Sequence, residues 1–274
     1  MENYILTRYL YSFAEAERSL FLCILKQDFE QALYWGYELY FSGFDEETFE
    51  FCCRMAEEFY RKKVSMKKYI MSQKDKWLKN TDNHILIGNS IALLCNNNPN
   101  ITNFVKTYFG VNCKKEEENT IQTDNKYSMT DELLTPLFTF QDHSVFPYKV
   151  LKMVQKHSPI KHYRDLFRTI IPENSNEIRD GKWLYYASRS PIWYERIIQY
   201  KGIINEETES ISFENDDNLD EFYNHWGYEP EEQSKEIHYN MGLPCDIEQK
   251  DLTAFCNELH YRIPKITKKK AKKE

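Results

Sequence analysis

The feature that most constrains the fold is a helical spacing of apolar residues near the start of the chain. Between positions 28 and 42, apolar residues recur at intervals of three and four, which places them on one face of an α-helix. They are Phe29, Ala32, Leu33, Gly36, Tyr37, Tyr40 and Phe41. Asp28 stands where an N-cap carboxylate is expected, and Gly43 stands where a left-handed C-cap residue is expected. A helix over 4–26 before this one and a helix over 46–62 after it complete a predicted unit of three packed helices.

The same pattern continues as short helices with short links, so we predict an all-α fold. An N-terminal array of short helical hairpins is expected over 1–113, and an aromatic-rich, mainly helical subdomain over 128–264. Residues 114–127 are polar and charged, which predicts a mobile linker, and the Lys-rich tail 265–274 is predicted to be disordered. Further helices are expected over 66–79, 85–95 and 99–109 before the linker. The second half is expected to contain helices over 147–157, 159–169, 183–187, 191–200, 219–226 and 247–260 and a short β-hairpin over 203–213.

Cysteine usage and apolar run length bear on the compartment. The chain of 274 residues contains seven cysteines, an odd number, and no Cys-x-x-Cys pair. Most of them fall on apolar helical faces, a pattern typical of reduced, buried thiols in an intracellular protein. The longest apolar run is far shorter than the roughly 20 residues of a membrane-spanning helix, and the first residues lack the pattern of a signal peptide. We therefore expect a soluble, intracellular protein with no membrane partner.

No catalytic, cofactor-binding or metal-binding motif can be identified in the sequence. The chain lacks Gly-rich phosphate loops and the Gly-x-Ser-x-Gly nucleophile elbow. Asp216, Asp217 and Asp220 match the spacing DDxxD, which in prenyl-transferring enzymes holds Mg²⁺ and a diphosphate. Because no second acidic motif accompanies it, Asp217 is better interpreted as a helix cap. We expect no catalytic residue, no cofactor and no metal, and an enzyme is the third functional interpretation.

An acidic stretch interleaved with aromatic residues is the strongest candidate for a binding surface. Residues 202–234 contain eleven acids and no Lys or Arg. Such a stretch creates a negative field that attracts a basic protein segment. We expect the acids to contact the partner and two aromatic side chains to anchor it; these residues are Asp216, Asp217, Asp220, Glu221, Phe222 and Trp226. The alternative is an ordinary solvated face, with the aromatic residues inside and the acids outside.

A basic stretch over 54–79 supports a second interpretation, nucleic-acid binding. It holds nine Lys or Arg residues against three acids. Cationic side chains neutralise phosphates, and aromatic side chains stack on bases. The residues expected to carry this contact are Lys62, Lys63, Lys67, Lys68 and Trp77. An exposed amphipathic helix is the alternative explanation. The Lys-rich tail suits the same nucleic-acid partner, nuclear import, solubility or self-association with the acidic stretch of a second copy.

Three stretches resemble uncharacterised proteins of large nucleocytoplasmic DNA viruses. They are AERSLFLCILKQDFEQALYWGYELYFSGF from Ala16, WLYYASRSPIWYERI from Trp183 and WGYEPEEQ from Trp226. The resemblance implies a viral protein that works in the infected cell or is packaged in the virion, and it implies no activity and no site. The sequence as a whole predicts a non-catalytic protein-protein interaction or scaffold protein with a partner that is basic, and a nucleic-acid-binding protein is the alternative.

Overall fold

The computed structural model describes residues 4–116, 126–139, 156–170, 178–226, 235–241 and 247–264. Helices dominate these residues, which confirms the predicted all-α class. The helices are α1 (Phe13–Lys26), α2 (Phe29–Tyr40), α3 (Asp45–Phe59), α4 (Val64–Trp77), α5 (Ile85–Cys95), α6 (Thr102–Phe109), α7 (Asp131–Thr139), α10 (Trp183–Ala187), α11 (Pro191–Gln199), α12 (Asp216–Trp226), α13 (Lys235–Asn240) and α14 (Leu252–Glu258), with a π-helical turn η1 (Ile178–Lys182) before α10.

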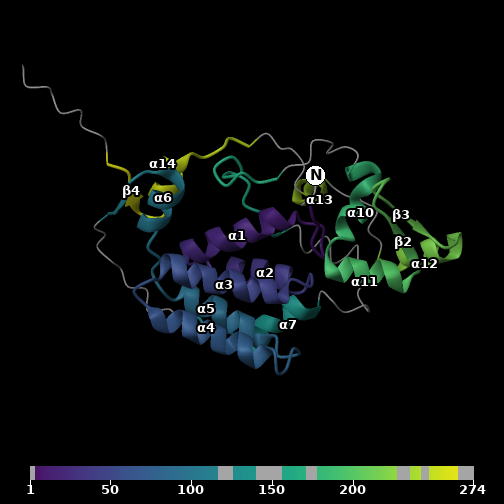
Figure 1. The fold of residues 1–274 in the computed structure, drawn as a ribbon, viewed down its shortest axis with the longest axis horizontal. Helices are drawn as coiled ribbons and strands as arrows, with labels where there is room; N and C mark the ends of the chain where they lie inside the picture. The colour runs from purple at the N-terminus through teal and green to yellow at the C-terminus, as the bar shows by residue number, and fades with distance from the viewer. Residues whose placement is uncertain are drawn as a thin grey trace, which may run out of the picture.

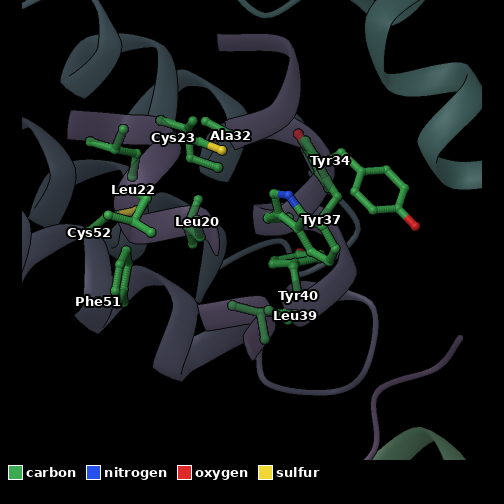
Figure 2. Close-up of a cluster of buried hydrophobic side chains, with 14 of the residues drawn as sticks. Leu20, Leu22, Cys23, Ala32, Tyr34, Tyr37, Leu39, Tyr40, Phe51 and Cys52 are labelled. Carbon is green, nitrogen blue, oxygen red and sulfur yellow. The ribbon is translucent and has the colours of Figure 1, made fainter. Parts of the chain in front are cut away.

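The first five helices form a stacked array with α2 inside it (Figure 1). Helix α2 packs against α1, α3 and α5, and α4 packs against α3 and α5. Helices α6 and α14 lie at one end of the array, and α10, α11 and α12 lie at the other (Figure 1). Figure 2 shows apolar side chains of α1, α2 and α3 meeting in the interior, among them Leu20, Ala32 and Cys52.

The turns between the first three helices have the predicted N-cap, but not the predicted C-cap, because α2 ends at Tyr40 with Phe41 as its C-cap. The carboxylate of Asp28 accepts a hydrogen bond from the backbone N–H of Gln31, so it caps α2 as expected. Gly43 has a φ of +91°, a backbone conformation that residues with a Cβ rarely adopt. A Cβ at that position would also lie 2.5 Å from the Pro191 side chain. The helix over 46–62 is observed as α3, three residues shorter at its end.

The prediction of a helix over 4–26 is wrong for its first nine residues. Residues 4–12 form a compact, non-helical segment in which Leu6 pairs with Ser12 as an antiparallel bridge. The side chains of this segment are almost all buried, including Tyr4, Tyr9 and Tyr11. Because these residues are buried on every side, the segment has no polar face. Its conformation is set by tertiary packing and not by the local preference for a helix.

Two small antiparallel sheets complete the described part of the fold. Strands β2 (Gly202–Asn205) and β3 (Ser210–Phe213) pair with Gly202 opposite Phe213, which confirms the predicted hairpin. Strands β1 (Lys114–Lys115) and β4 (Tyr261–Arg262), which lie far apart in the sequence, pair in an antiparallel arrangement. The start of the predicted linker 114–127 therefore lies in a strand. At the other end of this predicted linker, the Asn96 side-chain amide donates a hydrogen bond to the backbone carbonyl of Tyr127 and accepts one from its backbone N–H.

Other expectations for the second half had mixed outcomes. Helices α10, α11 and α12 are found where helices over 183–187, 191–200 and 219–226 were expected, although α12 begins at Asp216. The helix predicted over 159–169 is wrong, because this segment forms successive turns. Residues 117–125, most of 147–157 and the tail 265–274 lie outside the described residues. Side chains of both predicted halves share one buried cluster, and the domain boundaries stay a prediction.

Candidate functional site

A groove with a volume of about 400 Å³ lies between α1, α3, α6 and the end of the segment 156–170. Two helices supply most of its walls through one face each. From α1 come Ala14, Glu17, Arg18 and Phe21, and from α3 come Phe51, Arg54, Met55, Glu58 and Phe59. In both helices these residues follow the i, i+3, i+4, i+7 spacing that brings side chains to one face. The two faces mix apolar and charged residues.

Aromatic side chains form the floor of the groove. Phe21 makes edge-to-face contacts with Phe59 and Phe167, with ring centroids 5.4 and 5.5 Å apart. Phe104 of α6 packs against the same rings, at 5.7 Å from Phe21 and 5.3 Å from Phe59. These separations lie in the range that favours aromatic pairs. Behind them, Phe255 of α14 contacts Phe167 at 5.6 Å. The floor is therefore preformed by packing between four parts of the chain.

The rim exposes apolar surface beside this floor. Tyr108, one helical turn after Phe104, is 63% exposed, and Ile170 is 45% exposed. The Tyr108 ring lies 4.8 Å from that of Phe104. An exposed large apolar patch next to a recess is a common mark of an interaction site in soluble proteins.

The charged groups of the groove are arranged around a buried arginine. Arg18 is 6% exposed. Its Nε donates to the backbone carbonyl of Ile160 at 3.2 Å, and its Nη1 donates to Thr169 Oγ1. Its Nη2 is buried and has no hydrogen-bond partner in the described part of the chain. Burial lowers the pKa of Arg18 to about 10, so the guanidinium remains charged at neutral pH. A buried cation with an unused donor is a group that an anion stabilises.

The other charges partly compensate one another. Arg54 Nη2 lies 3.3 Å from Glu17 Oε1 in a largely exposed pair. Burial raises the pKa of Glu17 and of Glu58, since desolvation disfavours their charged forms. Arg168 is exposed at the rim. Among the described residues that line the groove are three arginines and two glutamates, whose formal charges sum to +1.

A buried ion cluster fixes the segment that forms one groove wall. Glu15 of α1 accepts a hydrogen bond from Arg164 Nε at 2.5 Å, and its other carboxylate oxygen lies 3.4 Å from Lys161 Nζ. All three side chains are almost fully buried. Ser19 Oγ, one turn further along α1, accepts from the backbone N–H of Ile160 at 2.8 Å. Helix α1 therefore holds residues 160–164, which lead directly to Phe167, Arg168 and Thr169.

The predicted acidic surface has exposed acids, as expected, but its two aromatic residues are buried. Asp216, Asp217, Asp220 and Glu221 are exposed on α12. Phe222 is 0% exposed and packs against Phe213 and Tyr200, while Trp226 is 6% exposed and lies under the Arg196 guanidinium at 3.8 Å. The expectation that Phe222 and Trp226 anchor a partner is therefore wrong. They attach α12 to α11 and the hairpin because their large apolar surfaces are more stable out of water.

The basic stretch also differs from its prediction at its aromatic residue. Lys62, Lys63 and Lys68 are exposed, whereas Lys67 pairs with Glu57 of α3. Trp77 is 5% exposed, and its Nε1 donates to Tyr40 Oη at 2.7 Å. The expectation that Trp77 stacks on bases is therefore wrong. A second lysine of α4 is also paired with acids of α3, since Lys74 lies close to Glu46 and Glu50.

The thiols in the described part of the chain match the expected pattern. Cys23, Cys52, Cys95, Cys113 and Cys256 are buried and reduced, and Cys53 is half-buried. Burial raises the pKa of Cys23 to about 12, which keeps the thiol protonated and unreactive. Among the same described residues, no group of three or more His, Cys, Asp or Glu side chains is placed to hold a metal ion.

The groove itself was missed at the level of sequence. Arg18 and Arg54 are charged residues within amphipathic helices, and such residues normally face solvent. A signal was nevertheless present, since Arg18 is flanked by Ala14 and Phe21 on one helical face. The contacts that bury Arg18 join positions about 142 residues apart in the chain. Local periodicity does not reveal such contacts.

Comparisons with protein-family models, curated proteins and solved structures found no match to this chain. In the residues that the structure describes, no helix is long and apolar enough to span a bilayer.

Proposed function

We propose that this chain is a non-catalytic protein-protein interaction protein that receives part of a partner in the aromatic groove. One observation carries the proposal. A preformed recess with an aromatic floor also contains a buried arginine whose Nη2 has no hydrogen-bond partner among the residues that the structure describes. Recesses lined by aromatic residues with a few polar groups are typical of binding sites, and aromatic and arginine residues contribute much of the energy at protein interfaces.

The dimensions of the groove favour a short segment of a partner. Its volume of about 400 Å³ lies near the lower end of the range for ligand pockets. One aromatic side chain with its neighbouring backbone fills such a space. The exposed Tyr108 and Ile170 extend the apolar surface beyond the recess, so a partner protein can contact the rim while one of its residues enters the groove.

The four exposed acids of α12 remain part of the proposal as a second contact. Asp216, Asp217, Asp220 and Glu221 present a negative surface without the aromatic anchor that the sequence predicted. Surface charge of this kind accelerates association with a basic partner more than it adds affinity. The resemblance of three stretches to proteins of large DNA viruses supports, within this proposal, a scaffold role in the infected cell or the virion.

Affinity purification with and without nuclease tests the function. We expect the wild-type chain to retain protein partners after nuclease treatment, and Tyr108→Ala to lose most of them, because Tyr108 supplies exposed apolar surface at the groove. The matched control is Tyr194→Ala, which removes a 50% exposed tyrosine from α11, away from the groove. Recovery that disappears on nuclease treatment contradicts the proposal and supports nucleic-acid binding by Lys62, Lys63 and Lys68.

A further inference from the structure

The groove combines a cation and an aromatic floor within one small space. Arg18 lines it together with Phe21, Phe104 and Phe167. Two of the three nitrogens of the Arg18 guanidinium are already bonded to the segment 160–169, which fixes the plane of the group. Within the described ranges, the third nitrogen, Nη2, has no hydrogen-bond partner. A group that completes this site must therefore present an acceptor at Arg18 and an apolar body over the phenylalanine rings.

We infer that the groove takes a carboxylate and an aromatic ring carried by one residue, the arrangement at the C-terminus of a polypeptide that ends in Phe, Tyr or Trp. This inference rests on the proposed function and specifies the partner segment. The carboxylate lies at Arg18 and Arg168, and the ring lies on the aromatic floor beside Tyr108. A free aromatic carboxylic acid has the same chemistry, and the experiment below separates the two sources.

The charge of the groove favours a monoanion. The described lining residues carry a net formal charge of +1, because Glu17 and Glu58 offset two of their three arginines. A singly charged carboxylate neutralises this excess, whereas a phosphate dianion adds charge near two carboxyl groups. Guanidinium and carboxylate also match in planar geometry, which gives charge-assisted hydrogen bonds of good direction.

The floor favours an aromatic ring over an aliphatic chain. The rings of Phe21, Phe59, Phe104 and Phe167 are 5.3 to 6.3 Å apart and mostly inclined to one another. Aromatic rings associate best in edge-to-face or offset arrangements at such separations. A further ring beside Tyr108 extends this network, and it adds dispersion contacts that a linear chain does not reproduce.

Matched ligand pairs test the inference on the full chain. The probes are a pentapeptide Ser-Gly-Ser-Gly-Phe with a free C-terminus, the same peptide as a C-terminal amide, 3-phenylpropionate and 3-phenylpropionamide. We expect the acid peptide to bind at least about tenfold more tightly than its amide by calorimetry, a factor equal to about 1.4 kcal/mol. If the peptide acid binds and 3-phenylpropionate binds only weakly, a polypeptide C-terminus is the natural ligand class. Tighter binding of 3-phenylpropionate assigns the site to a free acid and overturns the peptide inference.

Protein variants locate the binding. Arg18→Met is expected to lower the affinity for the acid peptide by about tenfold or more and to leave the affinity for the amide unchanged. Thermal unfolding shows whether this variant folds. Tyr108→Ala should lower the affinity for both peptides, and Tyr194→Ala should change neither affinity. Equal binding of acid and amide by the wild type, or no binding of either, overturns the inference even where Arg18→Met does not fold. In that case partner recovery that still depends on Tyr108 leaves the proposed function standing.

Discussion

Replacing Glu38 with Ala is expected to lower the free energy of unfolding by about 3–5 kcal/mol, because it leaves the Arg8 guanidinium buried without its carboxylate. Both side chains are 0% exposed, and Arg8 Nε lies 2.9 Å from Glu38 Oε2. Glu38 Oε1 also accepts from the backbone N–H of Tyr9 at 3.1 Å. The pair therefore ties the non-helical segment 4–12 to α2. Urea unfolding followed by tryptophan fluorescence measures the loss.

An exposed ion pair provides the control for this variant. Glu46 lies 2.8 Å from Lys74 Nζ, and its side chain is 56% exposed. Glu46→Ala should change stability by no more than about 1 kcal/mol, since water and salt screen such pairs. The double variant Arg8→Met with Glu38→Leu should recover much of the loss, because it removes both buried charges together. A loss for Glu38→Ala no larger than that for Glu46→Ala contradicts the structural role of the pair.

Replacing Glu15 with Ala is expected to have an effect of similar size and to disrupt the groove as well. The change leaves Arg164 and Lys161 buried without their shared carboxylate, which costs about 3–5 kcal/mol. Because Glu15 holds residues 160–164 against α1, the wall formed by Phe167, Arg168 and Thr169 loses its anchor. Hydrogen exchange should show faster exchange over 160–170, while α4 and α5 keep their protection.

The double variant Glu15→Leu with Arg164→Met separates charge from packing. It removes one acid and one base together, and we expect it to restore more than half of the stability that Glu15→Ala loses. If hydrogen exchange over 160–170 is as slow in Glu15→Ala as in the wild type, the ion cluster of Glu15, Lys161 and Arg164 does not anchor the groove wall.

Elements with strong local signals were predictable from the sequence. Helix α5 was predicted over 85–95 and is observed over Ile85–Cys95. Its apolar residues are flanked by polar turns on both sides, so local propensity and tertiary packing agree. The hairpin over 203–213 was predictable for a similar reason, because two apolar segments flank a polar turn. Helix α7 was not predicted, and Pro136 in its interior is a residue that normally ends a helix.

The groove depends on contacts that local patterns do not encode. Residues 159–169 form turns rather than a helix. Their buried Lys161 and Arg164 pair with Glu15, a residue far away in the chain. Phe222, Trp226 and Trp77 stand among charged residues in the sequence, which is why they were expected on binding surfaces. Helical periodicity places such aromatic residues inside and the charged residues outside. Their burial confirms this alternative for all three.

Site-specific photo-crosslinking tests the central claim, that the groove receives a partner segment, most directly. A benzophenone side chain is placed at position 108 in the groove rim or, as the matched control, at position 194 on α11. Both positions hold an exposed tyrosine in the wild type. We predict a crosslinked protein adduct from position 108 that excess Ser-Gly-Ser-Gly-Phe acid suppresses and its amide does not, and no such adduct from position 194. Equal adducts from the two positions, or no adduct from position 108, would contradict the central claim. An adduct at 108 that neither peptide affects would overturn only the inference about a C-terminal carboxylate.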